Sequence, residues 1–153
     1  KFINFISNEK LSEIIVSTGM TNDSYFKYIL NKFKKFKKLY LLHAISTYPC
    51  SFADININIV RKFSELRKNV IPGYSSHDPG YYGSMLAVAA GALMIEKHVK
   101  TGVTNWVHYD DAAIDVNYEL SKFIKVLQRT HEAMGSQAKI VYPHEHHKYD
   151  FKK

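Results

Sequence analysis

The segment of residues 70–98 constrains the fold more than any other part of this chain. Two short apolar runs flank a helical stretch in it, and its sequence is VIPGYSSHDPGYYGSMLAVAAGALMIEKH. A strand, a tight turn, a helix and a second strand in this order form a βαβ unit with parallel neighbouring strands. Residues i and i+2 of a strand point to the same face. Ser75 is therefore grouped with His77 at one strand end, and Glu96 with His98 at the next.

The two histidines are predicted to share one metal ion. Parallel strands lie about 5 Å apart, and imidazole nitrogens bind metals at roughly 2.0–2.2 Å, so His77 and His98 can converge on a common ligand. Glu96 on the same face is costly to bury unless a cation or metal pairs with it. A histidine at a strand end is also often a structural hydrogen-bonding residue, and this interpretation is preferred for His43.

Composition limits the class of protein. The 153 residues are 46% hydrophobic and 23% charged, which predicts one globular unit. Residues 84–95 form the longest weakly polar run, which is shorter than the ~20 residues that cross a bilayer, so no membrane association is expected. The N-terminus has no secretory signal pattern, and a lone Cys50 fits a reducing compartment, so we expect a cytoplasmic protein. The chain opens with Lys1 and is expected to be part of a longer product.

Much of the formal net charge of +7 comes from the run NKFKKFKK at residues 31–38. Phe33 and Phe36 are spaced i, i+3 and are expected in the core, with the lysines solvated near a helix C-terminus. A nucleic-acid patch is the alternative, but no arginine-rich helix or aromatic stacking motif supports it, so no nucleic-acid partner is expected. The basic excess favours small anionic substrates.

Apolar strands and amphipathic helices alternate along residues 1–135. Strands are predicted at 13–17, 39–43, 70–74 and 93–97, and helices at 2–9, 21–36, 54–67, 81–90 and 116–134. This alternation predicts an α/β fold with parallel βα units. Ligands of such folds bind at the carboxyl ends of the strands, where Ser17, Ser46 and Ser75 recur at equal intervals. These serines could alternatively cap the helices that follow them.

Residues 136–153 are predicted to be a separate polar tail rich in His and Lys. His144, His146 and His147 have the composition of a metal-binding tract. An unstructured C-terminus is the preferred interpretation.

Four motifs stand in order at the predicted strand ends. They are IVSTGM at 15–20, LLHAISTYP at 41–49, GYSSHDPG at 73–80 and GALMIEKH at 91–98. This series resembles the C-terminal half of the catalytic barrel of the sialic acid synthase family. The resemblance covers about residues 10–135 and implies half of a TIM-type (β/α)₈ barrel, namely its strands five to eight.

The resemblance also implies a chemistry for the full-length protein, leaving open whether these 153 residues act alone. Such enzymes condense phosphoenolpyruvate with an N-acetylated sugar such as N-acetylmannosamine. The product is a nine-carbon sialic-type acid, and phosphate is released. Two histidines of the family bind a divalent metal, typically Mn²⁺ with Mg²⁺ as the alternative.

The family roles map onto individual residues. The resemblance makes His77 and His98 the metal ligands and, with Glu96, the catalytic set. The residues implied in substrate binding are Ser17, Ser46 and Ser75 for phosphoenolpyruvate, and Tyr48, together with Glu96, for the sugar.

The chain departs from the family pattern at several positions. Ser76 stands where the family often has Asp. The loop after the last strand reads NWVHYDD at 105–111, and His108 and Asp110 are expected to take over the sugar side. The first half of the family barrel, with its substrate-binding lysines, is not in this chain.

Two alternative functions remain. Half a barrel leaves two sheet edges unpaired, so the chain could be an inert association module that pairs with another copy, as a homodimer, or with the missing half. A different metal-dependent barrel aldolase or lyase is the other alternative. An imine mechanism is disfavoured because no strand-end lysine is available, with Lys97 expected to face away from the site.

Overall fold

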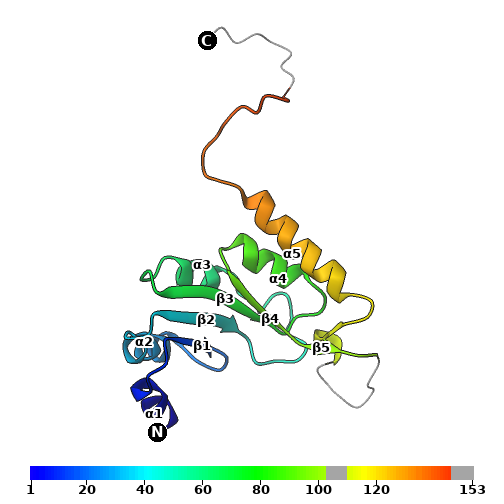
Figure 1. Cartoon of the computed structure of the whole chain (residues 1–153). Helices are drawn as coiled ribbons and strands as arrows, with labels where there is room; N and C mark the ends of the chain where they lie inside the picture. The colour runs from blue at the N-terminus through cyan, green and yellow to red at the C-terminus, as the bar shows by residue number, and fades with distance from the viewer. Residues whose placement is uncertain (103–109, 146–153) are drawn as a thin grey trace.

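The computed structural model describes residues 1–102 and 110–145. Its centre is a parallel four-stranded sheet with the strands in chain order. The strands are β1 (Glu13–Ser17), β2 (Lys38–Ala44), β3 (Val70–Ser76) and β4 (Met94–Lys97). The connecting helices are α2 (Asp23–Lys32), α3 (Asn58–Ser64) and α4 (Tyr82–Ala89), and the sheet curls as in part of a TIM-type barrel (Figure 1).

Other elements lie at the two ends of the chain. Helix α1 (Phe2–Asn8) precedes the sheet, and α5 (Leu120–Met134) packs against α4 (Figure 1). Between β4 and α5, the short strands β5 (Val99–Lys100) and β6 (Ile114–Asp115) form a separate parallel pair, and a 3₁₀ turn occupies Asp110–Ala112. This pair was not predicted because two-residue strands leave no periodicity in the sequence.

The predicted strands are confirmed to within two residues at each end, but three helices are shorter than predicted by four residues or more. Helix α2 ends at Lys32, since Phe33 and Phe36 reach the core through a turn in which the Phe36 N–H donates to the Phe33 carbonyl. Helix α3 spans only Asn58–Ser64. Helix α5 begins at Leu120 because the Asp115 carboxylate accepts the N–H groups of Asn117 and Tyr118 and holds a turn there.

The core lies between the helices and one face of the sheet. Phe33 and Phe36 are buried as predicted, and their rings meet edge to face at 5.3 Å, while most of the neighbouring lysines are exposed. The buried residues of this cluster are Phe26, Ile29, Phe33, Phe36, Leu39, Leu41, Phe63 and Val70. A smaller cluster, of Val60, Tyr74, Ala87 and Ala92, packs under α4.

The opposite face of the sheet is the inside of the curve. Laterally paired residues of parallel strands point the same way, so the Ser75–Glu96 pair of β3 and β4 lies on this face. Ser17 of β1 points to it as well, since it pairs with Leu42, which in turn pairs with Gly73. At the β1 edge this face is open, and Ile15 keeps 56% of its surface exposed.

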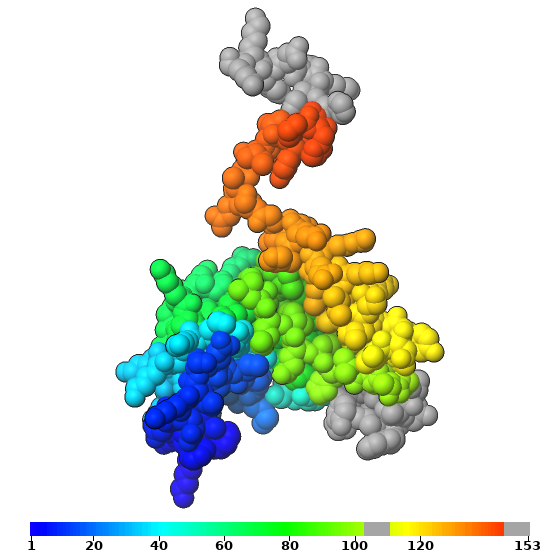
Figure 2. Space-filling view, in the orientation of Figure 1, coloured from blue at the N-terminus to red at the C-terminus, as the bar shows by residue number. Residues whose placement is uncertain are grey.

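The described part of the tail, residues 136–145, contains no helix or strand and is exposed. It extends away from the rest of the molecule beyond α5 (Figure 2). Within the described ranges, no helix has the length and apolarity needed to cross a membrane.

Candidate functional site

His77 is anchored by the main chain of the neighbouring strand's loop. It is buried directly after β3, and its Nδ1 lies 2.6 Å from the carbonyl oxygen of Ile45. A carbonyl can only accept, so Nδ1 carries the proton and Nε2 of the neutral ring keeps a lone pair. The Tyr48 hydroxyl donates to this Nε2 at 3.0 Å. A backbone carbonyl on the second nitrogen is the usual way in which proteins orient a metal-binding histidine.

Glu96 is brought to the same place by the register of β3 and β4. Ser75 and Glu96 are lateral partners, and the Ser75 hydroxyl donates to Glu96 Oε1 at 2.5 Å. The same hydroxyl oxygen lies 3.4 Å from His77 Nε2. A carboxylate and an imidazole therefore share one serine contact at the strand ends.

His98 completes the cluster from the end of β4. Its ring centroid lies 5.4 Å from that of His77 and 5.4 Å from that of Tyr48. Metal–nitrogen bonds of about 2.0–2.2 Å put each centroid roughly 3.2 Å from a shared ion, so adjacent imidazole ligands have centroids about 5 Å apart. The observed separation fits two ligands of one ion.

The surroundings of His98 favour its neutral form. Burial lowers the pKa of His98, nearby His77 and Lys97 lower it further, and Glu96 opposes them. A neutral imidazole is the form that binds metals. Among the described residues, no group of three or more His, Cys, Asp or Glu side chains is placed to hold a metal, so His77 and His98 offer a two-ligand set.

Ser17 and Ser46 lie at the same edge of the sheet but outside this cluster. Both are exposed, and neither side chain makes a hydrogen bond within the described ranges. The main chain of Gly19 passes close to Ser46, because a Cβ at Gly19 would lie 2.3 Å from the Ser46 Oγ. The capping alternative is wrong for all three serines, since the helix N-caps are Asn22, Ile57 and Tyr81.

The structure does not test the two sugar-side residues predicted in the loop after β4, His108 and Asp110. His108 lies outside the described residues, and so does the side chain of Asp110. In the tail, His146 and His147 also lie outside them.

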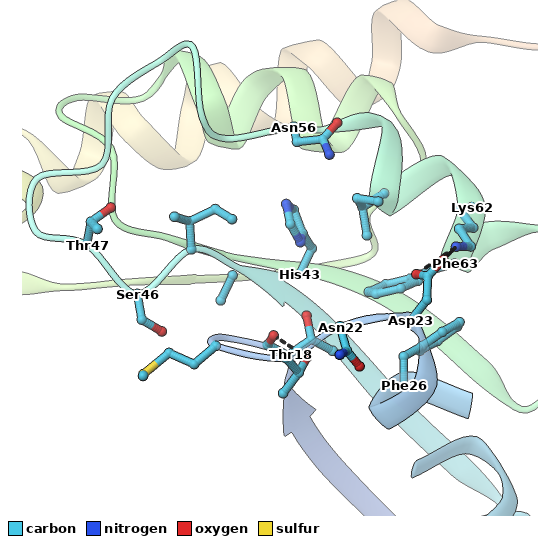
Figure 3. A pocket seen from close by; sticks show the side chains of 15 residues that line it. Thr18, Asn22, Asp23, Phe26, His43, Ser46, Thr47, Asn56, Lys62 and Phe63 are labelled. Atoms are coloured by element: carbon cyan, nitrogen blue, oxygen red, sulfur yellow. Dashed lines mark hydrogen bonds and ion pairs between the residues drawn. The ribbon is translucent and has the colours of Figure 1, made fainter. Parts of the chain in front are cut away.

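A cavity separate from the histidine cluster is lined in part by residues 43–47. Its volume is about 430 Å³, and Figure 3 shows the His43 ring pointing into it. The Nε2 of His43 donates to the Ile55 carbonyl at 2.7 Å, and burial lowers the pKa of His43. At the rim, Lys62 pairs with Asp23 at 3.0 Å. The buried His43 ring is thus hydrogen-bonded to the main chain, as predicted for a structural histidine.

Sequence reasoning missed a buried polar network behind the cluster, built on Asp78 and Lys97. The sequence GYSSHDPG could have predicted this network. Residues alternate between the two faces of a strand, so Ser76 and Asp78 are expected on the face opposite to Ser75 and His77.

Comparison with known proteins assigns the family. A sequence profile matches residues 1–139, and it is that of the NeuB family. The chain belongs to the NeuB family. Its relatives include the N-acetylneuraminate-9-phosphate synthase of Homo sapiens, 28% identical over 131 residues that make up 85% of this chain and 36% of the relative. The N,N'-diacetyllegionaminic acid synthase of Campylobacter jejuni is 33% identical over 131 residues, 83% of this chain and 39% of that relative.

A solved structure supports the same assignment. The N-acetylneuraminic acid (sialic acid) synthetase of Leptospira borgpetersenii, in complex with citrate, superposes with a TM-score of 0.80 at 27% identity. The match covers 93% of this chain and 49% of that one. This NeuB-family chain thus spans well under half the length of the curated relatives described above and about half of the solved chain, and the resemblance to sialic acid synthases is confirmed at the level of family and partial barrel.

Proposed function

We propose that this chain forms one wall of the active site of a sugar-acid synthase, and that its four strands are strands five to eight of the barrel. The whole protein would condense phosphoenolpyruvate with an N-acetylated sugar of the N-acetylmannosamine type. The observation that carries the proposal is the convergence of His77, His98, Tyr48 and Glu96 at the carboxyl ends of β3 and β4.

His77 and His98 would hold a divalent cation, Mn²⁺ or alternatively Mg²⁺. Two observations support the fit: the Ile45 carbonyl leaves Nε2 of His77 as the acceptor nitrogen, and the ring spacing suits a shared ion. Two imidazoles leave most coordination positions to oxygen donors, as these cations require. When bound, such an ion polarises an aldehyde oxygen as a Lewis acid.

The chain's own residues have distinct parts in the proposed reaction. Ser75, with Ser17 and Ser46, would bind phosphoenolpyruvate through hydroxyl donors. Tyr48 and Glu96 would orient the sugar so that the enol carbon attacks its aldehyde carbon. Water then adds to the resulting cationic carbon, its proton goes to the new alkoxide oxygen, and the phosphate leaves.

Partners and setting follow from the same proposal. His108 and Asp110 would complete the sugar side. The open inner face at Ile15 would be covered by the remaining barrel half or by a second copy. The reaction would take place in the cytoplasm.

The test is phosphate release from phosphoenolpyruvate by the full-length protein with Mn²⁺ and N-acetylmannosamine. We expect His77→Ala and His98→Ala each to lower the rate by at least 100-fold, since outer-shell changes alone cost about 10–100-fold. His131→Ala, an exposed change on α5, is the matched control and should leave the rate unchanged. Full activity in either site variant would overturn the proposed site. The inert-module alternative is not favoured, since the family's characterised relatives are synthases.

A further inference from the structure

A buried polar network lies on the helix side of β3 and β4, directly behind the histidine cluster. Asp78 has no exposed surface. Its Oδ1 accepts from the hydroxyls of Tyr74 at 2.7 Å and Ser76 at 2.8 Å, and its Oδ2 accepts from the N–H of Gly83 at 3.1 Å. Gly83 is in the first turn of α4, where the helix dipole favours a carboxylate. Every part of this carboxylate therefore has a partner.

Lys97 joins the network from the neighbouring strand. Its ammonium donates to the Ser76 hydroxyl at 2.9 Å and to the main-chain carbonyl of Asp78. Burial lowers the pKa of Lys97, while the charges of Asp78 and Glu119 oppose this. An ammonium taken out of water needs such compensation, so Lys97 and Asp78 depend on each other.

The space around the carboxylate is closely shaped. A Cβ on Gly83 would lie 2.4 Å from Asp78 Oδ2 and 2.6 Å from its Cγ. The absence of a side chain at Gly83 is therefore what lets the carboxylate sit on the N-terminal turn of α4. Small displacements of Asp78 are blocked on this side, which makes the network a rigid support.

We propose that Asp78 and Lys97 are positioning residues that set the spacing between His77 and His98. Asp78 directly follows His77, and Lys97 stands between Glu96 and His98. The bond from Lys97 to the Asp78 carbonyl thus ties the end of β3 to the end of β4 on the face behind the site. His98 lies one residue beyond β4, where its main-chain carbonyl accepts from the N–H of Ile114 at 3.0 Å. The Lys97 link acts one residue before this bond, between the ends of β3 and β4. The inference rests on the proposed function, since it takes both histidines as metal ligands.

The test measures Mn²⁺ binding to the full-length protein by calorimetric or spin-resonance titration. Lys97→Met keeps most of the side-chain volume and removes the ammonium, and Asp78→Asn keeps the shape and removes the charge. We expect each to raise the Kd for Mn²⁺ roughly tenfold, the lower end of the range for residues that orient metal ligands. Because both belong to one network, the double variant should be less than additive.

The matched control is Lys38→Met. Lys38 also links two neighbouring strands, through its 2.8 Å ion pair with Glu13, but at the far end of the sheet. We expect an unchanged Kd. Activity gives a second readout: phosphate release by Lys97→Met should recover at saturating Mn²⁺, which a general loss of structure would not allow.

If Asp78→Asn does not fold, a second variant that moves the carboxylate from position 78 to position 76 tests the proposal. The Ser76 hydroxyl already touches both Asp78 and Lys97. The double change Ser76→Asp with Asp78→Ser should therefore restore the charge beside Lys97 and recover most of the affinity that Asp78→Ser loses.

The outcomes separate the two proposals. Wild-type Mn²⁺ affinity in folded Lys97→Met and Asp78→Asn would overturn the positioning role and leave the proposed function standing. If these variants lose thermal stability but bind Mn²⁺ with wild-type affinity, the positioning role is likewise overturned and the proposed function stands. Absence of Mn²⁺ binding by the wild-type protein would remove the metal site itself and this inference with it.

Discussion

The hydroxyl of Tyr48 lies on the nitrogen that His77 would offer to a metal. It donates to Nε2 at 3.0 Å, and the two ring centroids are 4.1 Å apart. Tyr48→Phe removes this hydrogen bond and keeps the ring. A typical hydrogen bond contributes about 0.5–1.5 kcal/mol net, and about 1.4 kcal/mol corresponds to tenfold in affinity. Because an ion at Nε2 must displace the hydroxyl, the substitution should tighten Mn²⁺ binding.

The expected size is at the lower end of that range. Tyr48 is only partly buried, so water replaces some of the lost bond, and we expect the Kd for Mn²⁺ to fall about two- to fivefold. Titration of the full-length protein with Mn²⁺, followed by the spin-resonance signal of the free ion, measures this directly. Tyr40→Phe is the control, because the Tyr40 hydroxyl makes a comparable 3.3 Å contact with Glu13 at the other end of the sheet.

The direction in which the Kd for Mn²⁺ changes in Tyr48→Phe tests whether the hydroxyl and the ion compete. An unchanged Kd in Tyr48→Phe would show that the hydroxyl does not compete for His77. A tenfold weaker affinity would show that the hydroxyl helps to hold the ion. Either result would refute the proposed competition.

Three further predictions concern folding of the same chain. Burial lowers the pKa of His43 below its usual 6.5, so the unfolded state takes up the proton first and the free energy of unfolding should fall as the pH drops below about 6.5. Urea titrations at pH 7.5 and 5.5 measure this slope, and His43→Gln should reduce it. Gly73→Ala should cost about 1–3 kcal/mol of stability, because a Cβ there would lie 2.9 Å from the Met94 carbonyl oxygen. A urea denaturation midpoint equal to that of the wild type would contradict the close packing of β3 on β4. Phe63→Ala should cost about 3–5 kcal/mol, since Phe63 is buried, whereas exposed Phe52→Ala should cost far less in the same urea assay.

Local patterns explain why much of the fold could be predicted. The strand Glu13–Ser17 was located to the residue, because a β-branched apolar run between polar residues has few other conformations. The boundary of α2 was harder. Phe33 and Phe36 fit a helical repeat equally well, and only their packing in the core shows that the helix has already ended.

The candidate site was predictable only where its members are near in sequence. Ser75 and His77 share a face by simple alternation, and Glu96 with His98 likewise. That Tyr48 would lie on His77 could not be read from the chain, because 29 residues separate them and their contact depends on the path of a loop. The proton position on His77 is likewise set by a distant carbonyl, that of Ile45.

The sequence by itself determined the order of strands and helices and the side of each strand on which a residue lies, because both follow from short-range periodicity of the backbone. Only the tertiary structure decided the distances across strands: the 5.4 Å between the rings of His77 and His98, and the contact of Lys97 with the main chain of Asp78. Such distances depend on register, twist and packing summed over the whole sheet, and no short stretch of residues encodes them.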